Sequence, residues 1–263
     1  MARVWDVPQA TDGVEEHLVS LLAPTSFAAE QYRALRHLVE QFHKSAELSV
    51  LAVTSPTVGD GKTTTAINLA GALAQAPDAR VLLVDIDLRR ASMLKQLGPV
   101  DPDRPGLVDA ILNPELPLDD VTQLCPPFNL SVVPAGRRQA IQYELLKSPR
   151  LGELLGEARR RYDYVLLDTP PLVPVPDSRL IGKWVDGFLM VVAAHRTPRK
   201  LLEEALSLID PAKIVGLVFN SDDRPLFGYS YGDYYPSPNG NGLSRWGRAV
   251  KAAGGSLRRR LTD

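Results

Sequence analysis

The stretch VTSPTVGDGKTTTAINLA, residues 53–70, decides the fold of this chain. An apolar run at residues 48–53 leads into it and predicts a buried strand that ends at a small, glycine-containing turn. After the turn, apolar residues recur at the spacing of one helix face, namely Ala66, Ile67, Ala70, Leu73 and Ala74. A strand, a glycine turn and a helix in this order are typical of a phosphate-binding loop, because the loop amides and the helix N-terminus point at the anion.

Within this stretch, the pattern GxxxxGK[ST] is matched at Gly61, Lys62 and Thr63, with Pro56 at the position of its first glycine. Lys62 would supply a compact positive charge, and the Thr63 hydroxyl would reach Mg²⁺. An ordinary Gly-Lys turn before a helix is the alternative. If the loop holds a nucleotide, the residues predicted to bind it here are Gly59, Asp60, Gly61, Lys62, Thr63 and Thr64.

The composition restricts the class of protein. Of 263 residues, 44% are hydrophobic and 23% are charged, which is typical of an ordinary soluble globular protein. With 30 basic and 31 acidic residues the net charge is −1, so the overall charge gives no reason to expect nucleic acid as a partner. Cys125 is the single cysteine, which excludes an internal disulfide and fits a reducing cytosol. The longest apolar run, residues 187–194, is too short to span a bilayer, so we expect membrane association only through a surface or a partner.

Apolar runs alternate with helix-like segments along most of the chain. Further strands are predicted at residues 80–85, 129–133, 162–168, 188–193 and 214–219. Helices are predicted from the N-cap Ser26 to Phe42, at 107–112, at 144–161 with a break near Ser148 and Pro149, and from Thr197 and Pro198 to Ile209. This alternation predicts an α/β fold with a doubly wound, mostly parallel sheet and helices on both faces. We expect an N-terminal arm at residues 1–25, one domain at 26–220 and a tail at 221–263.

Carboxylates end two of the predicted strands. Strand periodicity puts Asp85 and Asp87 on the same side, near the C-terminal end of the strand at 80–85. Asp168 ends the strand at 162–168. Ligands of open α/β sheets bind at this edge, and carboxylates there suit Mg²⁺ coordination and the abstraction of a hydroxyl proton. One such Asp alone would be an ordinary turn residue, but all three, with Thr63, are predicted to form a metal site.

Three other segments have more than one interpretation. On the helix from Ser26, the residues Glu30, Arg33 and Arg36 share one face, as in an ordinary solvent-exposed ion pair. Residues 221–244 lack apolar periodicity, which predicts an exposed tail or a sticky low-complexity segment, and hold four of the eight tyrosines: Tyr229, Tyr231, Tyr234 and Tyr235. The basic residues of 244–262 suit either an anionic membrane surface or a merely solvated tail.

Together these motifs resemble the bacterial tyrosine kinases, or BY-kinases, of capsule and exopolysaccharide export, over about residues 17–235. That family has a phosphate loop, a second motif DxDxR and a third motif DTPP. In the same order this chain has GKT at 61–63, DIDLR at 85–89 and DTPP at 168–171. The resemblance implies that an ExxRxxR helix, here Glu30, Arg33 and Arg36, packs subunits into a ring.

The resemblance also implies phosphoryl transfer from ATP, with Mg²⁺, to tyrosines of a neighbouring subunit, here Tyr229, Tyr231, Tyr234 and Tyr235. Lys62 would neutralise the phosphates, and Asp85 would accept the tyrosine proton or hold a metal-bound water. Asp87 and Asp168 would complete the metal shell, and Arg89 would belong to the nucleotide site. Asn220, at the end of a predicted strand, either contacts the adenine or is a plain turn residue.

The resemblance implies partners as well. Family members are either fused to a membrane-spanning chain-length protein or activated by a separate one, and this chain resembles the separate kind. We therefore expect a cytoplasmic protein that such an activator recruits to the inner face of the membrane. We also expect a homo-oligomeric ring and a cognate tyrosine phosphatase as partners. We expect no nucleic acid partner.

Two other functions fit the same motifs. One is a MinD- or ParA-like ATPase switch, although such proteins carry an extra lysine early in the loop that residues 55–59 lack. The other is a non-catalytic, ATP-binding scaffold of a polysaccharide export machine, which would keep every motif. A GTPase is disfavoured, because DTPP stands where DxxG is expected.

Overall fold

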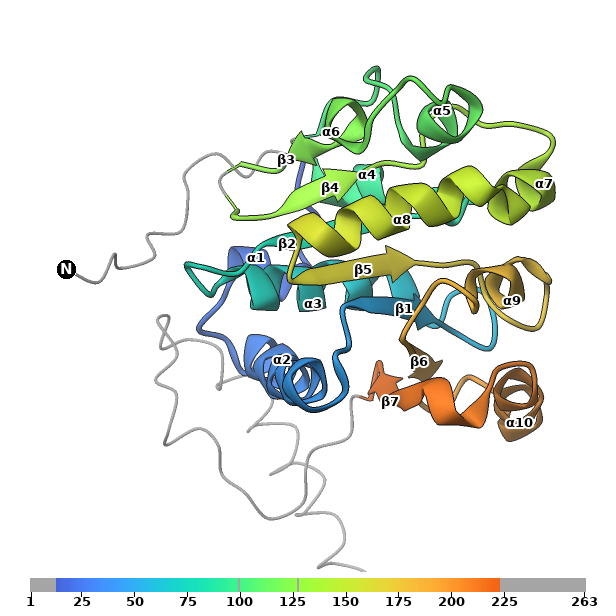
Figure 1. The fold of residues 1–263 in the computed structure, drawn as a ribbon. Coiled ribbons are helices and arrows are strands. Elements are labelled where there is room, and N and C mark those ends of the chain that lie inside the picture. The colour runs from blue at the N-terminus through green and yellow to red at the C-terminus, as the bar shows by residue number, and fades with distance from the viewer. Residues whose placement is uncertain (1–12, 99, 127, 223–263) are drawn as a thin grey trace, which may run out of the picture. The chain divides into compact units, whose positions relative to one another are not determined.

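A single seven-stranded sheet organises the part of the chain that the structure, a computed structural model, describes: residues 13–98, 100–126 and 128–222. The strands lie in the order β3-β4-β2-β5-β1-β6-β7 (Figure 1). Every pairing is parallel except that of β3 with β4. The bounds are β1 Val50–Thr54, β2 Val81–Asp85, β3 Gln123–Leu124, β4 Ser131–Val133, β5 Tyr164–Asp168, β6 Gly187–Ala193 and β7 Ile214–Asn220.

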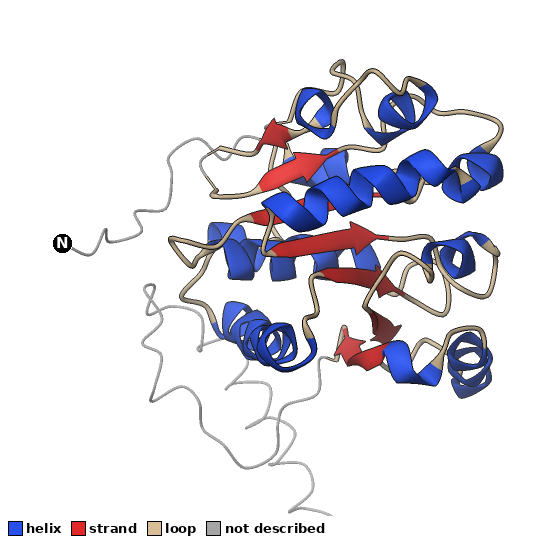
Figure 2. Cartoon of the chain, in the orientation of Figure 1, coloured by secondary structure: helices blue, strands red, loops and turns tan. Residues whose placement is uncertain are grey.

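Helices lie on both sides of this sheet (Figure 2). One side carries α1 Val19–Leu22, α2 Phe27–Ala46, α3 Lys62–Ala74 and α4 Met93–Leu97, whose buried residues form one apolar cluster. A second cluster covers the other side and holds α5 Leu107–Leu112, α6 Leu118–Val121, α7 Gln142–Lys147, α8 Pro149–Arg161, α9 Asp177–Ile181 and α10 Arg199–Ser207. A short 3₁₀ turn, Pro211–Lys213, leads into β7. The doubly wound, mostly parallel α/β fold that the alternation predicts is confirmed.

Strand β1 shows why its sequence is apolar without interruption. All five of its residues are buried. Val50 and Ala52 belong to one apolar cluster, whereas Leu51 and Val53 belong to the other. A strand in the middle of a parallel sheet is covered on both faces, so both of its alternating sets of side chains must be apolar.

The first helix of the predicted domain begins where the sequence indicates. The Ser26 hydroxyl accepts a hydrogen bond from the amide of Ala29 at 3.2 Å and caps α2. The helix continues to Ala46, four residues beyond the predicted end. Helical spacing predicts one apolar face made by Tyr32, Leu35, Leu38, Val39 and Phe42. Val39 is buried and Leu35 packs against the core, but Leu38 is 50% exposed. Arg36 turns toward α3 instead and donates to the Ala72 carbonyl at 2.9 Å.

Two further expectations have opposite outcomes. The predicted helix break is confirmed, since α7 ends at Lys147 and Pro149 opens α8 with Ser148 as its N-cap. The predicted N-cap at Thr197 is wrong: α10 begins at Arg199 and ends at Ser207. The Thr197 hydroxyl is used elsewhere, accepting from the Ala193 amide at 3.1 Å.

Residues 13–25 are the described part of the predicted arm, and they form hydrogen bonds with α3. The Asn68 side chain accepts a hydrogen bond from the Ser20 amide at 2.9 Å and donates one to the His17 carbonyl at 3.1 Å.

The two-residue strand β3 was not predicted, because two residues carry no periodicity. Among the described helices none combines the length and the hydropathy that a membrane span requires. The predicted domain limits at 25 and 220 stay predictions.

Candidate active site

The loop between β1 and α3 has the backbone of a phosphate cradle. Gly59 and Gly61 have φ angles of 87° and 93°, in the left-handed region that residues other than glycine rarely adopt. Helix α3 begins at Lys62, and the Gly61 carbonyl accepts from the amide of Thr65 at 2.9 Å. The amides of the first helical turn are therefore left for an anion, as at other helix N-termini that bind phosphate.

Side chains from the loop and from the chain after β6 fix this shape. The Asp60 carboxylate, 3% exposed, accepts from the Thr57 amide at 2.9 Å and from the Thr197 hydroxyl at 2.6 Å. The Arg196 guanidinium donates to the Gly59 carbonyl at 2.7 Å. Asp60 was predicted to bind the nucleotide, but its side chain points back into the loop and holds it.

Asn220, the last residue of β7, also lies against the loop. Its side-chain amide donates to the Asp60 carbonyl at 3.0 Å. A Cβ atom at Gly61 would lie 1.9 Å from the Asn220 Nδ2, so the loop has room for glycine alone at this position. The structure thus brings Asn220 to the loop, although it does not line the cavity described below.

Lys62 brings three of the predicted site residues together. Its ammonium lies 2.9 Å from the Asp87 carboxylate, 3.4 Å from that of Asp168 and 3.4 Å from the Thr63 hydroxyl. Asp87 follows β2 and Asp168 ends β5; these neighbouring parallel strands end at the same edge of the sheet (Figure 1). The structure thus brings together Lys62, Thr63, Asp87 and Asp168, as expected from the motifs, and their roles stay predictions.

The charges at this edge shift one another's pKa values. Burial alone would lower the pKa of Lys62, but the negative charges of Asp168 and Asp87 outweigh it and raise that pKa. The ammonium therefore stays charged. Asp168 is completely buried, and burial raises its pKa despite the attraction of Lys62.

Asp85 lies behind this group rather than in it. Its carboxylate accepts from the backbone amides of Asp87 at 3.2 Å and Met93 at 3.3 Å, and it is 1% exposed. Burial, followed by the charge of Asp168, raises the pKa of Asp85 to about 8. Near neutral pH this carboxyl is therefore mostly protonated.

A cavity of about 500 Å³ opens in front of the loop, and we refer to it as the nucleotide cavity. Most of the predicted binding residues line it, and among its described lining residues Asp87 is the one carboxylate. Arg89 also lines it and forms a two-point ion pair with the buried Asp177, at 2.5 and 3.1 Å. The predicted residues on its wall are Gly59, Gly61, Lys62, Thr63, Thr64, Asp87 and Arg89, whereas Asp60, Asp85, Asp168 and Asn220 lie behind it.

The residues at this edge fit a magnesium ion that takes most of its ligands from phosphate and water. The Asp168 Oδ2 atom is buried and has no hydrogen-bond partner among the described residues. An unpaired buried carboxylate oxygen is costly, so its position favours a cation close by. Within the described ranges, no group of three or more His, Cys, Asp or Glu side chains could enclose a metal. Mg²⁺ seldom needs such a cage when it binds with a nucleotide.

Sequence reasoning missed several residues of this site. Thr197, Arg196 and Asp177 come from loops and helices that carry no motif, and only the fold places them here. The Ser92 hydroxyl, which donates to the Thr63 hydroxyl at 3.3 Å, follows the second motif by three residues. Its nearness to Arg89 in the sequence is the one signal that could have indicated it.

The predicted subunit interface is only partly exposed. Arg33 forms an ion pair with Glu30 and donates to the Pro24 carbonyl. Arg36 pairs with Glu40 at 2.6 Å. These contacts lie within one chain, and the interface role of the three predicted residues stays a prediction. The four clustered tyrosines and the basic segment at 244–262 lie outside the described residues.

Comparison with known proteins agrees with the geometry. A family model described as an AAA domain matches residues 48–178. Tyrosine-protein kinase CpsD of Streptococcus agalactiae is 31% identical over 210 residues, which cover 78% of this chain and 87% of that protein. Tyrosine-protein kinase Wzc of Salmonella typhi is 34% identical over 226 residues, which cover 84% of this chain but 30% of that protein.

A solved structure gives the same result for the fold. The kinase domain of the Escherichia coli tyrosine kinase ETK matches 87% of this chain and 89% of its own length, with a TM-score of 0.74 and 27% identity. The chain spans less than a third of Wzc and most of CpsD. Its phosphate loop, its strand-end carboxylates and these likenesses show that the chain belongs to the family of bacterial tyrosine-protein kinases.

Proposed function

We propose that this chain is an ATP-dependent protein-tyrosine kinase that phosphorylates its own tyrosine cluster in a neighbouring copy. The observation that supports it best is the contact of Lys62 with Asp87, Asp168 and Thr63 at the wall of the nucleotide cavity. Phosphoryl transfer depends mainly on positioning and on charge stabilisation, and these residues supply both. Family membership supports this reaction type, and the residues at the nucleotide cavity suit it.

Each residue has a proposed role in binding. Lys62 and the free amides at the start of α3 would bind the β- and γ-phosphates of ATP. Mg²⁺, when bound, would offset the negative charge of these phosphates; Thr63, Asp87 and Asp168, with Asp85 behind them, would hold it. Arg89, held in place by Asp177, would face the phosphates from the second motif.

A tyrosine hydroxyl, with a pKa of about 10, needs a base near neutral pH. We assign the acceptance of its proton to Asp87, because this carboxylate lines the nucleotide cavity and Asp85 does not. In the reaction the bond between the γ-phosphorus and ADP breaks, a bond to the tyrosine oxygen forms, and the phenolic proton passes to Asp87. An ionised Asp85 next to Asp87 would favour that transfer by adding negative charge.

The cellular role is part of the same proposal. The acceptors are Tyr229, Tyr231, Tyr234 and Tyr235, presented by the neighbour in a ring that Glu30, Arg33 and Arg36 help to form. We propose that phosphorylation regulates capsule or exopolysaccharide polymerisation and export. A membrane-spanning chain-length protein would activate the kinase and recruit it to the inner face of the cell membrane, and a tyrosine phosphatase would reverse the reaction.

Incubation of the purified protein with ATP labelled at the γ-phosphate, and with Mg²⁺, tests this function. Label should enter the protein, and Lys62→Met should abolish it. Lys200→Met, which removes an equal charge from the exposed surface of α10, should leave labelling intact. Replacing all four cluster tyrosines with Phe should remove the label, and label that persists would overturn their assignment as acceptors.

The same assay separates the alternatives. Release of inorganic phosphate without labelled protein would indicate a hydrolytic switch of the MinD or ParA kind. Nucleotide binding with neither product, even after addition of the activator's cytoplasmic segment, would indicate a non-catalytic scaffold. Including that segment matters, because a kinase that requires its activator would otherwise be mistaken for a scaffold.

A further inference from the structure

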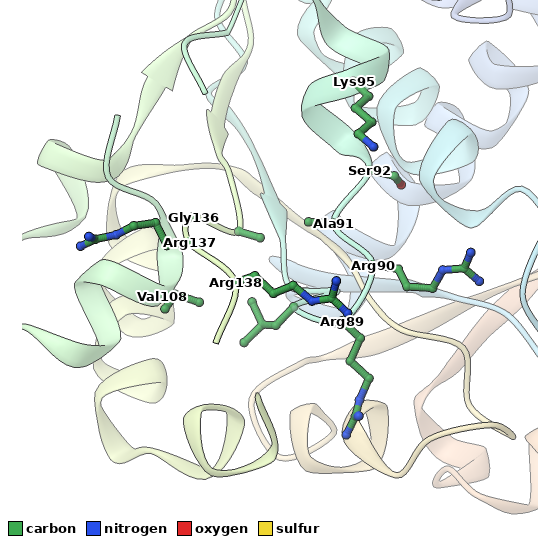
Figure 3. A pocket seen from close by; sticks show the side chains of 11 residues that line it. Arg89, Arg90, Ala91, Ser92, Lys95, Val108, Gly136, Arg137 and Arg138 are labelled. Carbon is green, nitrogen blue, oxygen red and sulfur yellow. The ribbon is translucent and has the colours of Figure 1, made fainter. Parts of the chain in front are cut away.

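A second cavity of about 500 Å³ lies beside the nucleotide cavity, and we refer to it as the basic cavity (Figure 3). Five cationic side chains line it, and among its described lining residues there is no carboxylate. They come from the segment after β2, from α4 and from the segment after β4, and they are Arg89, Arg90, Lys95, Arg137 and Arg138.

Two of the five cations are neutralised by neighbouring carboxylates. Arg89 pairs with Asp177, and Arg137 pairs with Asp109 at 2.9 Å. Figure 3 shows that Arg137 extends away from Arg138, so its charge does not face the cavity. The remaining cations of the basic cavity therefore decide what it attracts.

Arg90, Lys95 and Arg138 form no ion pair with any residue that the structure describes. Like charges around one cavity repel each other, and an anion carrying more than one negative charge relieves that repulsion. The planar guanidinium groups of arginine match the oxygen geometry of phosphate. Arg90 extends away from Arg138 in Figure 3 and also lines the nucleotide cavity, so Lys95 and Arg138 are the unpaired charges that act on a ligand here. Two cations favour a phosphate monoester over a single carboxylate.

The remaining wall of the basic cavity suits an aromatic ring. Leu88, Val108 and Ala135 line it, and all three are buried apolar residues. A ligand with an apolar ring and a dianionic tip would use both parts of this surface, because each part of the ligand meets a matching partner. Phosphotyrosine has this composition, with a phosphate charge of about −1.5 to −2.

The basic cavity also adjoins the proposed site of transfer. Arg89, Arg90 and Ser92 line both cavities. In the sequence, four tyrosines occur within residues 229–235. In an extended chain, positions two to six residues apart lie about 7–20 Å apart, a range that lets one tyrosine enter each of two adjoining cavities.

We propose that the basic cavity binds a tyrosine of the cluster that is already phosphorylated, on a second copy of this chain, while the next tyrosine enters the nucleotide cavity. This inference rests on the proposed kinase function. The first phosphorylation then increases the affinity of the same segment for the enzyme. Phosphates accumulate on one tail before another tail is used.

A binding experiment tests the cavity without any catalysis. Two fluorescent peptides of residues 226–238, one phosphorylated at Tyr229 and one unmodified, are titrated with the full-length, dephosphorylated protein. The phosphopeptide should bind at least about tenfold more tightly, as expected for charge-assisted hydrogen bonds to phosphate. Equal affinity for the two peptides would overturn the proposal.

Charge variants locate the binding. Lys95→Gln combined with Arg138→Gln should weaken phosphopeptide binding at least about tenfold. Arg137→Gln, the neighbouring change that removes an outward-facing charge, should weaken it less than about twofold. Equal losses in both proteins would show that a general electrostatic field, and not the cavity, holds the peptide. Unchanged thermal unfolding midpoints confirm that the variants fold.

Free phosphate is the other source of the same chemistry. If inorganic phosphate displaces the phosphopeptide as effectively as an unlabelled phosphopeptide does, the site is a phosphate site without preference for tyrosine, and the proposal fails. Displacement that requires a far higher concentration of inorganic phosphate supports it.

Mass spectrometry of the phosphorylated protein gives a second readout. The wild type should show chains with several phosphates beside chains with none. The Lys95→Gln/Arg138→Gln variant should show mainly single phosphates, with the rate of the first transfer unchanged. If the wild type gains no phosphate, the kinase proposal fails, whereas the peptide titration still decides whether the basic cavity binds phosphotyrosine.

Discussion

Asp85 and Asp168 are directly paired in the register of two neighbouring parallel strands, β2 and β5. Each is 1% exposed, and each ends its strand at the edge of the sheet that the phosphate loop faces. Burial and mutual repulsion make it costly for both carboxyls to be charged, so the pKa of Asp85 rises to about 8. This edge of the sheet therefore gains a negative charge as the pH rises through that value.

The first prediction concerns the pH dependence of phosphoryl transfer. The rate at low ATP concentration should rise with pH and level off above about pH 8, where Asp85 has lost its proton. Asp85→Asn should make the profile flat across this range. Asp87→Asn should lower the rate at every pH, because it removes the proposed proton acceptor.

Initial rates of self-phosphorylation between pH 6 and pH 9, at constant ionic strength, measure these profiles (the pH limits are about two units below and one above the value for Asp85). Asp78→Asn, an exposed change on a loop, serves as the control. A rising profile that persists in the Asp85→Asn protein would contradict the assignment.

The second prediction concerns stability. The folded pKa of Asp85, about 8, lies above the value near 3.9 of an unfolded aspartate, so the folded state binds more protons between these two values. The contribution of Asp85 to the free energy of unfolding should therefore decrease as the pH rises from about 4 to about 8. Asp85→Asn removes this contribution, so the variant should gain stability relative to the wild type as the pH rises. Chemical denaturation of both proteins at a series of pH values measures the difference.

Part of this site could be predicted because its residues are close together in the sequence or follow a strand pattern. Gly61, Lys62 and Thr63 are consecutive, and the end of an apolar strand indicates Asp168. The side chains that hold the phosphate loop in shape, Arg196 and Thr197, could not be predicted in this way. Arg196 lies 137 residues from the Gly59 that it contacts, and no local pattern records such a contact.

The buried face of α2 could be predicted only in part, for a related reason. Periodicity indicates which helix face is apolar, but packing also depends on specific hydrogen bonds. Arg36 donates to the Ala72 carbonyl and pairs with Glu40, which turns this side of the helix toward α3. Leu38, which the periodicity puts on the apolar face, is half exposed. Periodicity alone therefore does not identify every contact of the helix.

The third prediction concerns the fit of Gly61 against Asn220. Gly61→Ala should destabilise the protein by at least about 1–2 kcal/mol, because its left-handed backbone disfavours a Cβ atom. The new methyl would also collide with the Asn220 side chain. Adding Asn220→Ala should recover part of the loss but not the backbone strain. Thermal unfolding of Gly61→Ala, of the double variant and of Asn220→Ala alone completes a double-mutant cycle. Full recovery of stability in the double variant would contradict the role of the backbone.

The fourth prediction concerns Asp60. Asp60→Ala should cost about 1–3 kcal/mol of unfolding free energy, because the Thr57 amide and the Thr197 hydroxyl both lose their acceptor. Thr197→Val removes only one of these bonds and should cost less. Both variants should bind a fluorescent ATP analogue more weakly than the wild type. Normal ATP affinity in the Asp60→Ala protein would show that the loop keeps its shape without the hydrogen bonds to the Asp60 carboxylate.

The fifth prediction concerns the proposed ring. Arg33→Ala should shift the protein toward smaller assemblies in sedimentation velocity if this helix face joins subunits. Arg33 is a cleaner test than Arg36, whose side chain also contacts α3. Arg199→Ala, on the exposed surface of α10, serves as the control. An unchanged distribution of assemblies after Arg33→Ala would argue against the interface.

The contacts that hold the phosphate loop in shape also affect when the site can form during translation. Residues 48–178, which match the AAA domain model, contain the three nucleotide motifs but lack Arg196, Thr197 and Asn220. During synthesis on a ribosome, the GKT sequence therefore emerges long before the residues that shape its loop. A truncated chain that stops after α9 would carry all three nucleotide motifs without the bonds that Arg196, Thr197 and Asn220 make to the loop. Competence to bind ATP should then arise late in translation, once β7 has paired with β6.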